Sequence, residues 1–129
     1  MAEKQIVDPG WGWNQSFGYS QAVKAGGLLF VAGQMPVDSQ VQVVGAGDIR
    51  AQTRQTFENL KAVLAAAGAG PGDLVELVSY HTDMADLGAV VEVKGEYIAA
   101  DFPAWTAVGV TALALPGQMI EFKAVAVAH

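Results

Sequence analysis

The sequence predicts a mixed α/β domain in the order β-β-α-β-α-β-β, with both helices on one face of the sheet. Three observations lead to this fold class: a short chain, one strongly amphipathic helical segment, and strand segments that are apolar on both faces. The chain has 129 residues, well below the roughly 250 to 300 residues at which single cores divide into domains. Residues 1–129 are therefore expected to form one domain.

The first two strands are expected within residues 21–35. The apolar run of residues 28–31 follows the glycine pair 26–27, and a glycine pair between two short apolar segments is typical of a tight hairpin turn. Residues 36–47 are then expected to form a loop.

The next segment is predicted to be the first helix. Asp48 is a suitable N-cap, and the helix is expected to run to about Ala67 because Gly68 follows as a natural stop. Arg50 and Arg54 lie off the apolar face and are expected to form a solvated surface with a pair four residues apart. The apolar positions recur at helical spacing and include Phe57, Leu60, Leu64 and Ala67.

The second half of the chain alternates strands and a helix. Residues 74–80 are rich in Val and Leu and predict a strand. Residues 86–100 predict a second helix, weakened by two glycines. A long strand is expected over 104–115, a turn at Pro116-Gly117, and a last strand over 119–128, so that the last two strands form a hairpin.

The apolar character of the strands predicts self-association. Residues 108–110 and 124–127 are apolar on both faces, and two helices can cover only one face of the sheet. Hydrophobic residues make up 52% of the chain and charged residues 16%, a high ratio for a domain of this size. The second face is therefore expected to be buried by further copies of the chain.

Composition excludes several classes of function. The net charge is −6 with seven Lys and Arg residues, so no nucleic acid partner is expected. No apolar run reaches the length that spans a bilayer, and Met1 to Gly10 lacks the apolar core of a signal peptide. The chain has no cysteine and two histidines, which argues against disulfides, thiol catalysis and a metal site. A cytoplasmic protein without membrane association is expected.

Five ordered segments resemble the reactive-intermediate deaminase family (Rid, or YjgF-type, also called L-PSP endoribonuclease-like). The resemblance covers about residues 17–128, and the joint occurrence of the segments in this order is specific although each is short. The segments are Tyr19-Ser20-Gln21-Ala22-Val23, residues 30–36, residues 52–61, Phe102-Pro103-Ala104, and Ile120-Glu121 followed by Ala124-Val125-Ala126.

The resemblance implies a chorismate-mutase-like fold assembled as a homotrimer, with ligand pockets between subunits. Many members hydrolyse reactive enamines and imines to ketones and ammonia, and this chemistry requires neither a metal nor an organic cofactor. The resemblance also implies the residues of the site.

Three residues match the family's pocket pattern. Glu121 matches a glutamate thought to orient water or transfer protons; the alternative is a strand glutamate that points to solvent. Tyr19 matches a tyrosine that lines the pocket, against the alternative of a half-buried strand tyrosine, and Gly18 stands where the family has proline. Gly33 matches a glycine at which the backbone approaches the ligand, or else marks a strand bulge.

Trp105 departs from the family's pattern. Deaminating members have an arginine at this position that binds the substrate carboxylate, and indole cannot replace a bidentate guanidinium. Ala107 stands where some members have cysteine, and Val91 falls near the place of a helix asparagine. We therefore expect 2-iminopropanoate-type substrates to be poorly handled. Trp105 is expected either to stack a flat, aromatic or cationic substrate or to fill the pocket as packing.

Three functions compete. The first is an enamine or imine deaminase with a non-standard small substrate, for example an aromatic one. The second is a non-catalytic trimer that binds a small metabolite. The third is an endoribonuclease or translation inhibitor, which the net charge disfavours. Trp11 and Trp13 are expected to cover a neighbouring subunit's cleft or to latch onto their own chain, and His81 is expected to face solvent.

Overall fold

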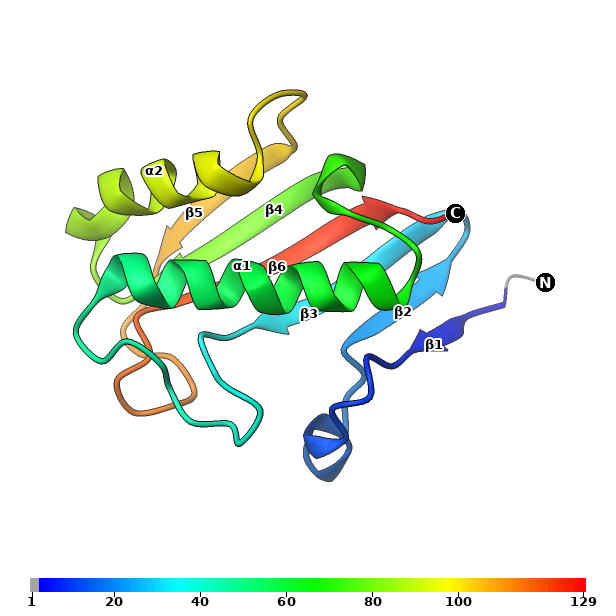
Figure 1. Cartoon of the computed structure of the whole chain (residues 1–129), viewed down its shortest axis with the longest axis horizontal. Helices are drawn as coiled ribbons and strands as arrows, with labels where there is room; N and C mark the ends of the chain where they lie inside the picture. Colours follow the sequence, from blue (N-terminus) through cyan, green and yellow to red (C-terminus); the bar gives the residue numbers. More distant parts are fainter. Residues whose placement is uncertain (1–2) are drawn as a thin grey trace.

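The computed structural model describes residues 3–129 and contains a six-stranded mixed sheet with two helices (Figure 1). The spatial order of the strands is β1-β2-β3-β6-β4-β5, and β4–β5 is the parallel pair among antiparallel neighbours. The elements are β1 (Gln5–Val7), β2 (Ala22–Ala25), β3 (Leu28–Gln34), α1 (Ile49–Ala66), β4 (Leu74–His81), α2 (Leu87–Tyr97), β5 (Ala104–Gly109) and β6 (Ile120–Val127), with three short 3₁₀ turns between them.

The hairpin of β2 and β3 forms as predicted. Ala25 pairs with Leu28, so Gly26 and Gly27 make the two-residue turn with φ values of 59° and 81°. Positive φ at both central positions is the geometry that favours glycine in such hairpins. Gln5–Val7, which the sequence analysis left unassigned, adds a short edge strand to β2.

Helix α1 also matches its prediction. The Asp48 side chain accepts a hydrogen bond from the Ala51 amide at the N-terminus, and Gly68 follows the C-terminus with φ 74°. Its apolar side chains pack on the sheet, where Phe57 contacts Phe122 of β6 with ring centroids 4.7 Å apart. This contact joins the helix to the centre of the core.

Two predicted element boundaries and one pairing are wrong. α2 ends at Tyr97 rather than near residue 100, and β5 ends at Gly109 rather than at residue 115. β5 pairs only with β4, which itself ends at His81 opposite Gly109, so the chain beyond has no strand to pair with. β5 and β6 are not a hairpin, because β4 lies between them.

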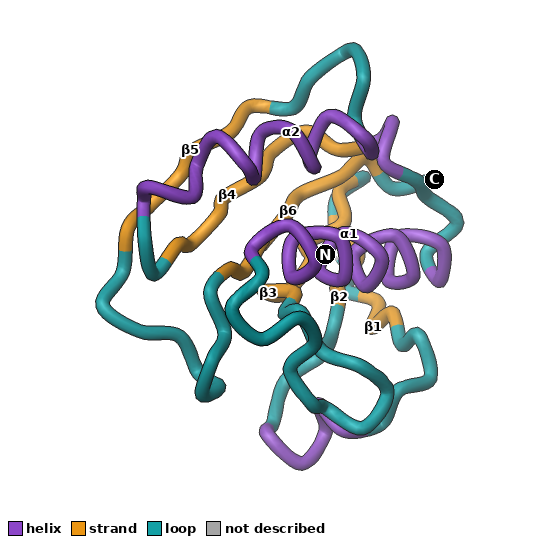
Figure 2. Tube along the Cα trace, turned by 60° about the vertical axis from the view of Figure 1, so that its left-hand side comes forward, coloured by secondary structure: helices purple, strands orange, loops and turns teal. Residues whose placement is uncertain are grey.

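Both helices cover the same face of the sheet (Figures 1 and 2). The prediction that one face stays uncovered is confirmed within the protomer. Phe30, on that open face, is 47% exposed, and the neighbouring Leu28 and Val127 are also exposed. Contiguous apolar residues on a strand surface are typical of a protein–protein interface. Within residues 3–129, no helix is long and apolar enough to cross a membrane.

Candidate functional site

The centre of the candidate site is the carboxylate of Glu121 on the open face of the sheet. Glu121 pairs with Tyr80 in the ladder of β6 and β4 and is partly buried. Its Oε1 accepts a hydrogen bond from Gln118 Nε2 at 3.1 Å. Its Oε2 has no hydrogen-bond partner among residues 3–129 and is therefore free to bind water or a ligand.

Gly33 provides the space that Glu121 occupies. A Cβ atom on Gly33 would lie 2.1 Å from Glu121 Oε2, a distance that no side chain could keep. Gly33 sits in a bulge, since the register of β3 against β6 shifts by one residue between Val31 and Gln34. Bulges redirect the backbone at functional places in sheets, and here the bulge turns the glycine toward the carboxylate.

Tyr19 approaches the same carboxylate from the N-terminal segment. Burial raises the pKa of the Tyr19 phenol, a polar contact with Gln21 opposes the shift, and the charge of Glu121 adds to it. Asn14 Nδ2 donates a hydrogen bond to the Tyr19 carbonyl at 2.8 Å and fixes the segment. Gly18 has φ 75°, which proline cannot adopt, so the departure from the family at this residue changes the local backbone.

Two glutamines support Glu121, and the sequence analysis assigned neither of them a role, although Gln52 opens a segment that matches the family. Gln118 Nε2 also donates to the Ile120 carbonyl, which holds the amide in place. Gln52 of α1 donates to the Gly117 carbonyl and accepts from the Met119 amide. The turn before β6 is thus tied to the helix layer, and the position of Glu121 follows from that anchoring.

Trp105 and Ala107 lie on the opposite face of the sheet from Glu121. Trp105 pairs with the buried Leu77 and packs against the core under α2. Its Nε1–H donates to Ser79 Oγ at 2.8 Å, so the indole donor is used within the chain. Ala107 follows on the same face, opposite Ser79. One protomer therefore does not bring Trp105 and Glu121 together.

The predicted solvent exposure of His81 is wrong. His81 is buried beside Ser79, and its Nε2 lies 2.7 Å from Ser79 Oγ. Because Ser79 Oγ already accepts from Trp105, its own proton can be donated to a neutral imidazole. Burial lowers the pKa of His81, with Asp86 opposing. The two hydrogen bonds that link Trp105 to Ser79 and Ser79 to His81 fix the orientation of the Trp105 indole.

The arginines of α1 are not a simple solvated face. Arg50 pairs with Glu92 and Arg54 with Glu96, both on α2, so the predicted pairing within α1 is replaced by bridges between the two helices. No group of three or more potential metal ligands occurs within residues 3–129.

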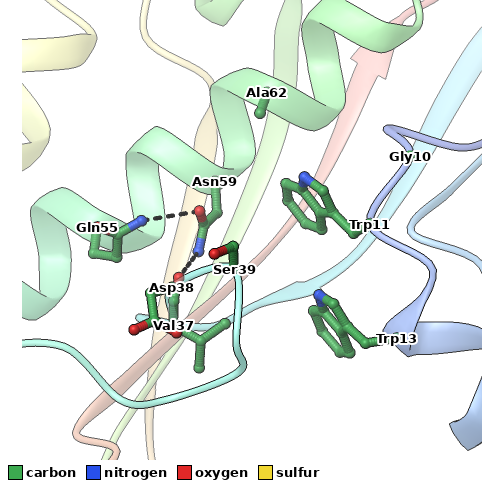
Figure 3. A pocket seen from close by; sticks show the side chains of 9 residues that line it. All are labelled: Gly10, Trp11, Trp13, Val37, Asp38, Ser39, Gln55, Asn59 and Ala62. Atoms are coloured by element: carbon green, nitrogen blue, oxygen red, sulfur yellow. Dashed lines mark hydrogen bonds between the residues drawn. The ribbon is translucent and has the colours of Figure 1, made fainter.

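Trp11 and Trp13 lie beside α1 of their own chain (Figure 3). Their indoles are nearly parallel, at 6°, with centroids 6.3 Å apart, and Trp11 packs against the core. They border a cavity of about 350 Å³ whose other wall is α1 and the loop after β3. At this wall, Asn59 Nδ2 donates to two backbone carbonyls and Asn59 Oδ1 accepts from the Gln55 side chain, while Asp38 Oδ1 accepts from two backbone amides. This geometry favours a role for Trp11 and Trp13 in stabilising their own chain over a role in covering the cleft of a neighbouring subunit.

Fold and site place the chain in a known family. The family model described as Endoribonuclease L-PSP matches residues 14–128. The chain therefore belongs to the L-PSP family, the Rid or YjgF family, as the sequence segments predicted.

Individual relatives cover nearly the whole chain. A RutC family protein of Pyrococcus horikoshii is 44% identical over 108 residues, which are 84% of this chain and 85% of that protein. A Dermatophagoides farinae protein named 2-iminobutanoate/2-iminopropanoate deaminase is 32% identical over 113 residues, 88% of each chain. The crystal structure of a YjgF/YER057c/UK114 family member from Mycobacterium tuberculosis has a TM-score of 0.84 at 33% identity and covers 98% of this chain and 100% of its own.

Proposed function

We propose that this protein is an enamine or imine hydrolase, a Rid-type deaminase whose sites lie between the subunits of a homotrimer. The observation that carries the proposal is the state of Glu121: one carboxylate oxygen is held by Gln118, and the other is free beside Gly33. The relative named as an imine deaminase supports the reaction class. The exposed apolar face around Phe30 supports the assembly.

The reaction needs little beyond a positioned carboxylate. Water adds to the electrophilic C=N carbon while Glu121 Oε2 takes one of its protons, which gives a carbinolamine. When the imine reacts in its protonated form, the carbinolamine nitrogen is neutral; return of the proton to this nitrogen lets the C–N bond break while the hydroxyl proton passes to Glu121, so the products are a ketone and ammonia. Positioned acid–base groups of this kind contribute about 10² to 10⁴-fold in rate. The Tyr19 phenol remains protonated at neutral pH and supplies a hydrogen-bond donor to the substrate.

The seam between subunits completes the proposed site. Glu121, Gly33 and Tyr19 line one side from the open face, and the neighbouring protomer supplies Trp105 and Ala107 at its β5 edge. Because Trp105 uses its Nε1–H within the chain, its contribution to a substrate is apolar contact. The proposed substrate is accordingly a small imine or enamine with an apolar or aromatic body, and 2-iminopropanoate is expected to be a poor one.

Ammonia release tests the proposal. Imines generated in place from a panel of amino acids by an amino acid oxidase are offered to the wild type and to Glu121→Gln. We expect release above the uncatalysed rate for the wild type and a loss of at least about 100-fold in the variant. Glu58→Gln, on the outer surface of α1, serves as the matched control and is expected to keep wild-type activity.

A metabolite-binding trimer without catalysis is the competing outcome. It is favoured if no imine or enamine shows Glu121-dependent turnover while a ligand still raises the melting temperature. A ligand at 100 times its dissociation constant stabilises the folded state by about 2.7 kcal/mol. Nucleic acid is not proposed as a partner because the net charge is −6.

A further inference from the structure

Lys94, on the last turn of α2, has an ammonium group with no anionic partner in the part of the chain that the structure describes. Its Nζ lies 4.9 Å from the centroid of the Trp105 ring and 5.5 Å from that of Phe102. The other basic residues of the two helices have acidic partners: Arg50 and Arg54 pair with glutamates of α2, and Lys61 lies 3.8 Å from a carboxylate oxygen of Glu58. No carboxylate oxygen of residues 3–129 lies within 4.0 Å of Lys94 Nζ.

Two aromatic rings hold this ammonium without using its donors. A cation within about 6 Å of a ring centroid is attracted by the face of the ring, but the three N–H groups of the ammonium remain available. The Trp105 ring is itself fixed, since Ser79 accepts its Nε1–H and His81 lies behind Ser79. Lys94 is thus a positive charge at a defined place on a rigid aromatic platform.

The platform is open to a ligand from outside the protomer. Phe102 is 67% exposed, and Val91, one helical turn before Lys94, is exposed as well. Apolar surface around the ammonium reduces its contact with water, and a less hydrated charge attracts an incoming carboxylate more strongly. An anionic group with an apolar body fits both parts of this surface.

We propose that Lys94 binds the carboxylate of the substrate, with the apolar body of the substrate against Phe102 and Trp105. The inference rests on the proposed function, and it names the substrate class as 2-imino acids with an apolar or aromatic side chain. Lys94 acts as a specificity-determining residue and takes no part in proton transfer. An ammonium is a single point charge and cannot form the bidentate contact of a guanidinium, so small 2-imino acids with no apolar body are held weakly.

The test compares charged and neutral forms of the same substrate. KM and kcat are measured for imines of phenylalanine and of phenylalaninamide with the wild type, Lys94→Gln and Lys94→Arg. We expect Lys94→Gln to raise KM for the carboxylate imine about 10- to 100-fold, as for loss of a charged hydrogen bond, and to change KM for the amide by less than about twofold. Lys94→Arg is expected to restore most of the affinity. Lys61→Gln is the matched control, because Lys61 also lies over an aromatic ring, that of Tyr97, at 5.7 Å.

Binding of the products separates this inference from the proposed function. Calorimetric titration with phenylpyruvate and with phenylpyruvamide is expected to show weaker binding of the keto acid alone in Lys94→Gln. If phenylpyruvate and the carboxylate imine bind the wild type and Lys94→Gln equally, Lys94 is not the carboxylate ligand, even where Glu121-dependent turnover stands. If turnover is absent but the Lys94-dependent difference in keto acid binding persists, the deaminase proposal fails and the anion site remains.

Discussion

Gly33 and Glu121 lie so close that the present position of the Glu121 carboxylate requires a residue without a side chain at position 33. Oε2 of Glu121 occupies the place that a Cβ atom of residue 33 would take, 2.1 Å from its ideal position. The glutamate side chain is flexible, so a larger residue at position 33 would displace the carboxylate rather than unfold the sheet. The glycine is therefore a determinant of carboxylate position, and the bulge in which it sits serves that position.

Gly33→Ala is predicted to lower kcat/KM for imine hydrolysis about 10- to 100-fold, because a shift of about 1 Å in a catalytic group has effects of that size. Stability should fall by only about 1 kcal/mol. Steady-state kinetics and urea denaturation measure the two effects. Gly95→Ala, at a helix position with no atom within 4 Å of the added Cβ, is the control and should leave kcat/KM unchanged. Wild-type kinetics in Gly33→Ala would show that Glu121 needs no defined position.

The residues that the sequence did not reveal share one physical feature: their roles depend on partners distant in the chain. His81 looks like an exposed strand histidine until Ser79 and Trp105 are placed beside it, because a buried imidazole is tolerated only with such a partner. Lys94 is one of several helix lysines and arginines, and only the position of the β5 segment sets it apart. The family resemblance, by contrast, predicts Glu121 and Tyr19 as site residues, and the structure brings them together.

At the scale of elements, local sequence patterns predicted α1, the β2–β3 hairpin and β6 closely, because caps, glycine turns and periodicity act within a few residues. The end of β5 could not be predicted in this way. Residues 110–115 are as apolar as a strand, but β4 ends at His81 and offers no further backbone partner. Strand length is a property of a pair of strands, so a single apolar run overestimates it.

The contact between α1 and α2 predicts a dependence of stability on alkaline pH. Tyr97 of α2 stacks on Phe57 of α1 with centroids 5.0 Å apart. Burial raises the pKa of Tyr97 to about 12, and Glu58 contributes further. The unfolded phenol ionises near 10, so the folded state keeps its proton longer. The stabilising contribution is complete below about pH 10 and is lost as the pH rises toward 12.

Tyr97→Phe removes this ionisation while keeping the stacked ring. The difference in free energy of unfolding between the wild type and Tyr97→Phe is expected to be constant from neutral pH to about pH 10. Above about pH 10, the wild type should lose stability relative to Tyr97→Phe, so the difference in free energy of unfolding moves progressively in favour of the variant. Urea denaturation at fixed protein concentration across this range measures it. A difference that stays constant to pH 12 would mean that Tyr97 titrates as it does in the unfolded chain.

At the scale of the whole molecule, the uncovered face of the sheet calls for an assembly. Phe30, Leu28 and Val127 form an apolar surface that the two helices cannot reach. Phe30→Glu places a charge on it, and burying an unpaired carboxylate costs several kcal/mol. We predict that sedimentation of the wild type gives three times the protomer mass of 13.4 kDa, and that the variant sediments as a folded protomer without hydrolase activity. Ala65→Glu, on the outer face of α1, should remain trimeric. A wild type that stays a single protomer at micromolar concentration contradicts the assembly.

Because the proposed site is divided between two faces of the sheet, the activity of trimers mixed from two variants can be predicted quantitatively. Glu121 and the Lys94–Trp105 group cannot meet within one protomer, so the proposed site takes Glu121 from one copy and Lys94 from the next. Glu121→Ala and Lys94→Glu are each expected to be inactive on 2-imino acids. In trimers refolded from an equal mixture, about one quarter of the seams combine an intact Glu121 with an intact Lys94, by the cyclic symmetry of the ring.

The mixture should therefore recover about a quarter of the wild-type activity, whereas a site contained in one protomer would recover none. Wild type mixed equally with the double variant separates the same two cases a second time. A shared seam again leaves about one quarter of the sites intact, and a site within one protomer leaves about one half. Agreement of both mixtures at one quarter requires that each site draw its proton-transfer group and its carboxylate-binding group from different copies of the chain.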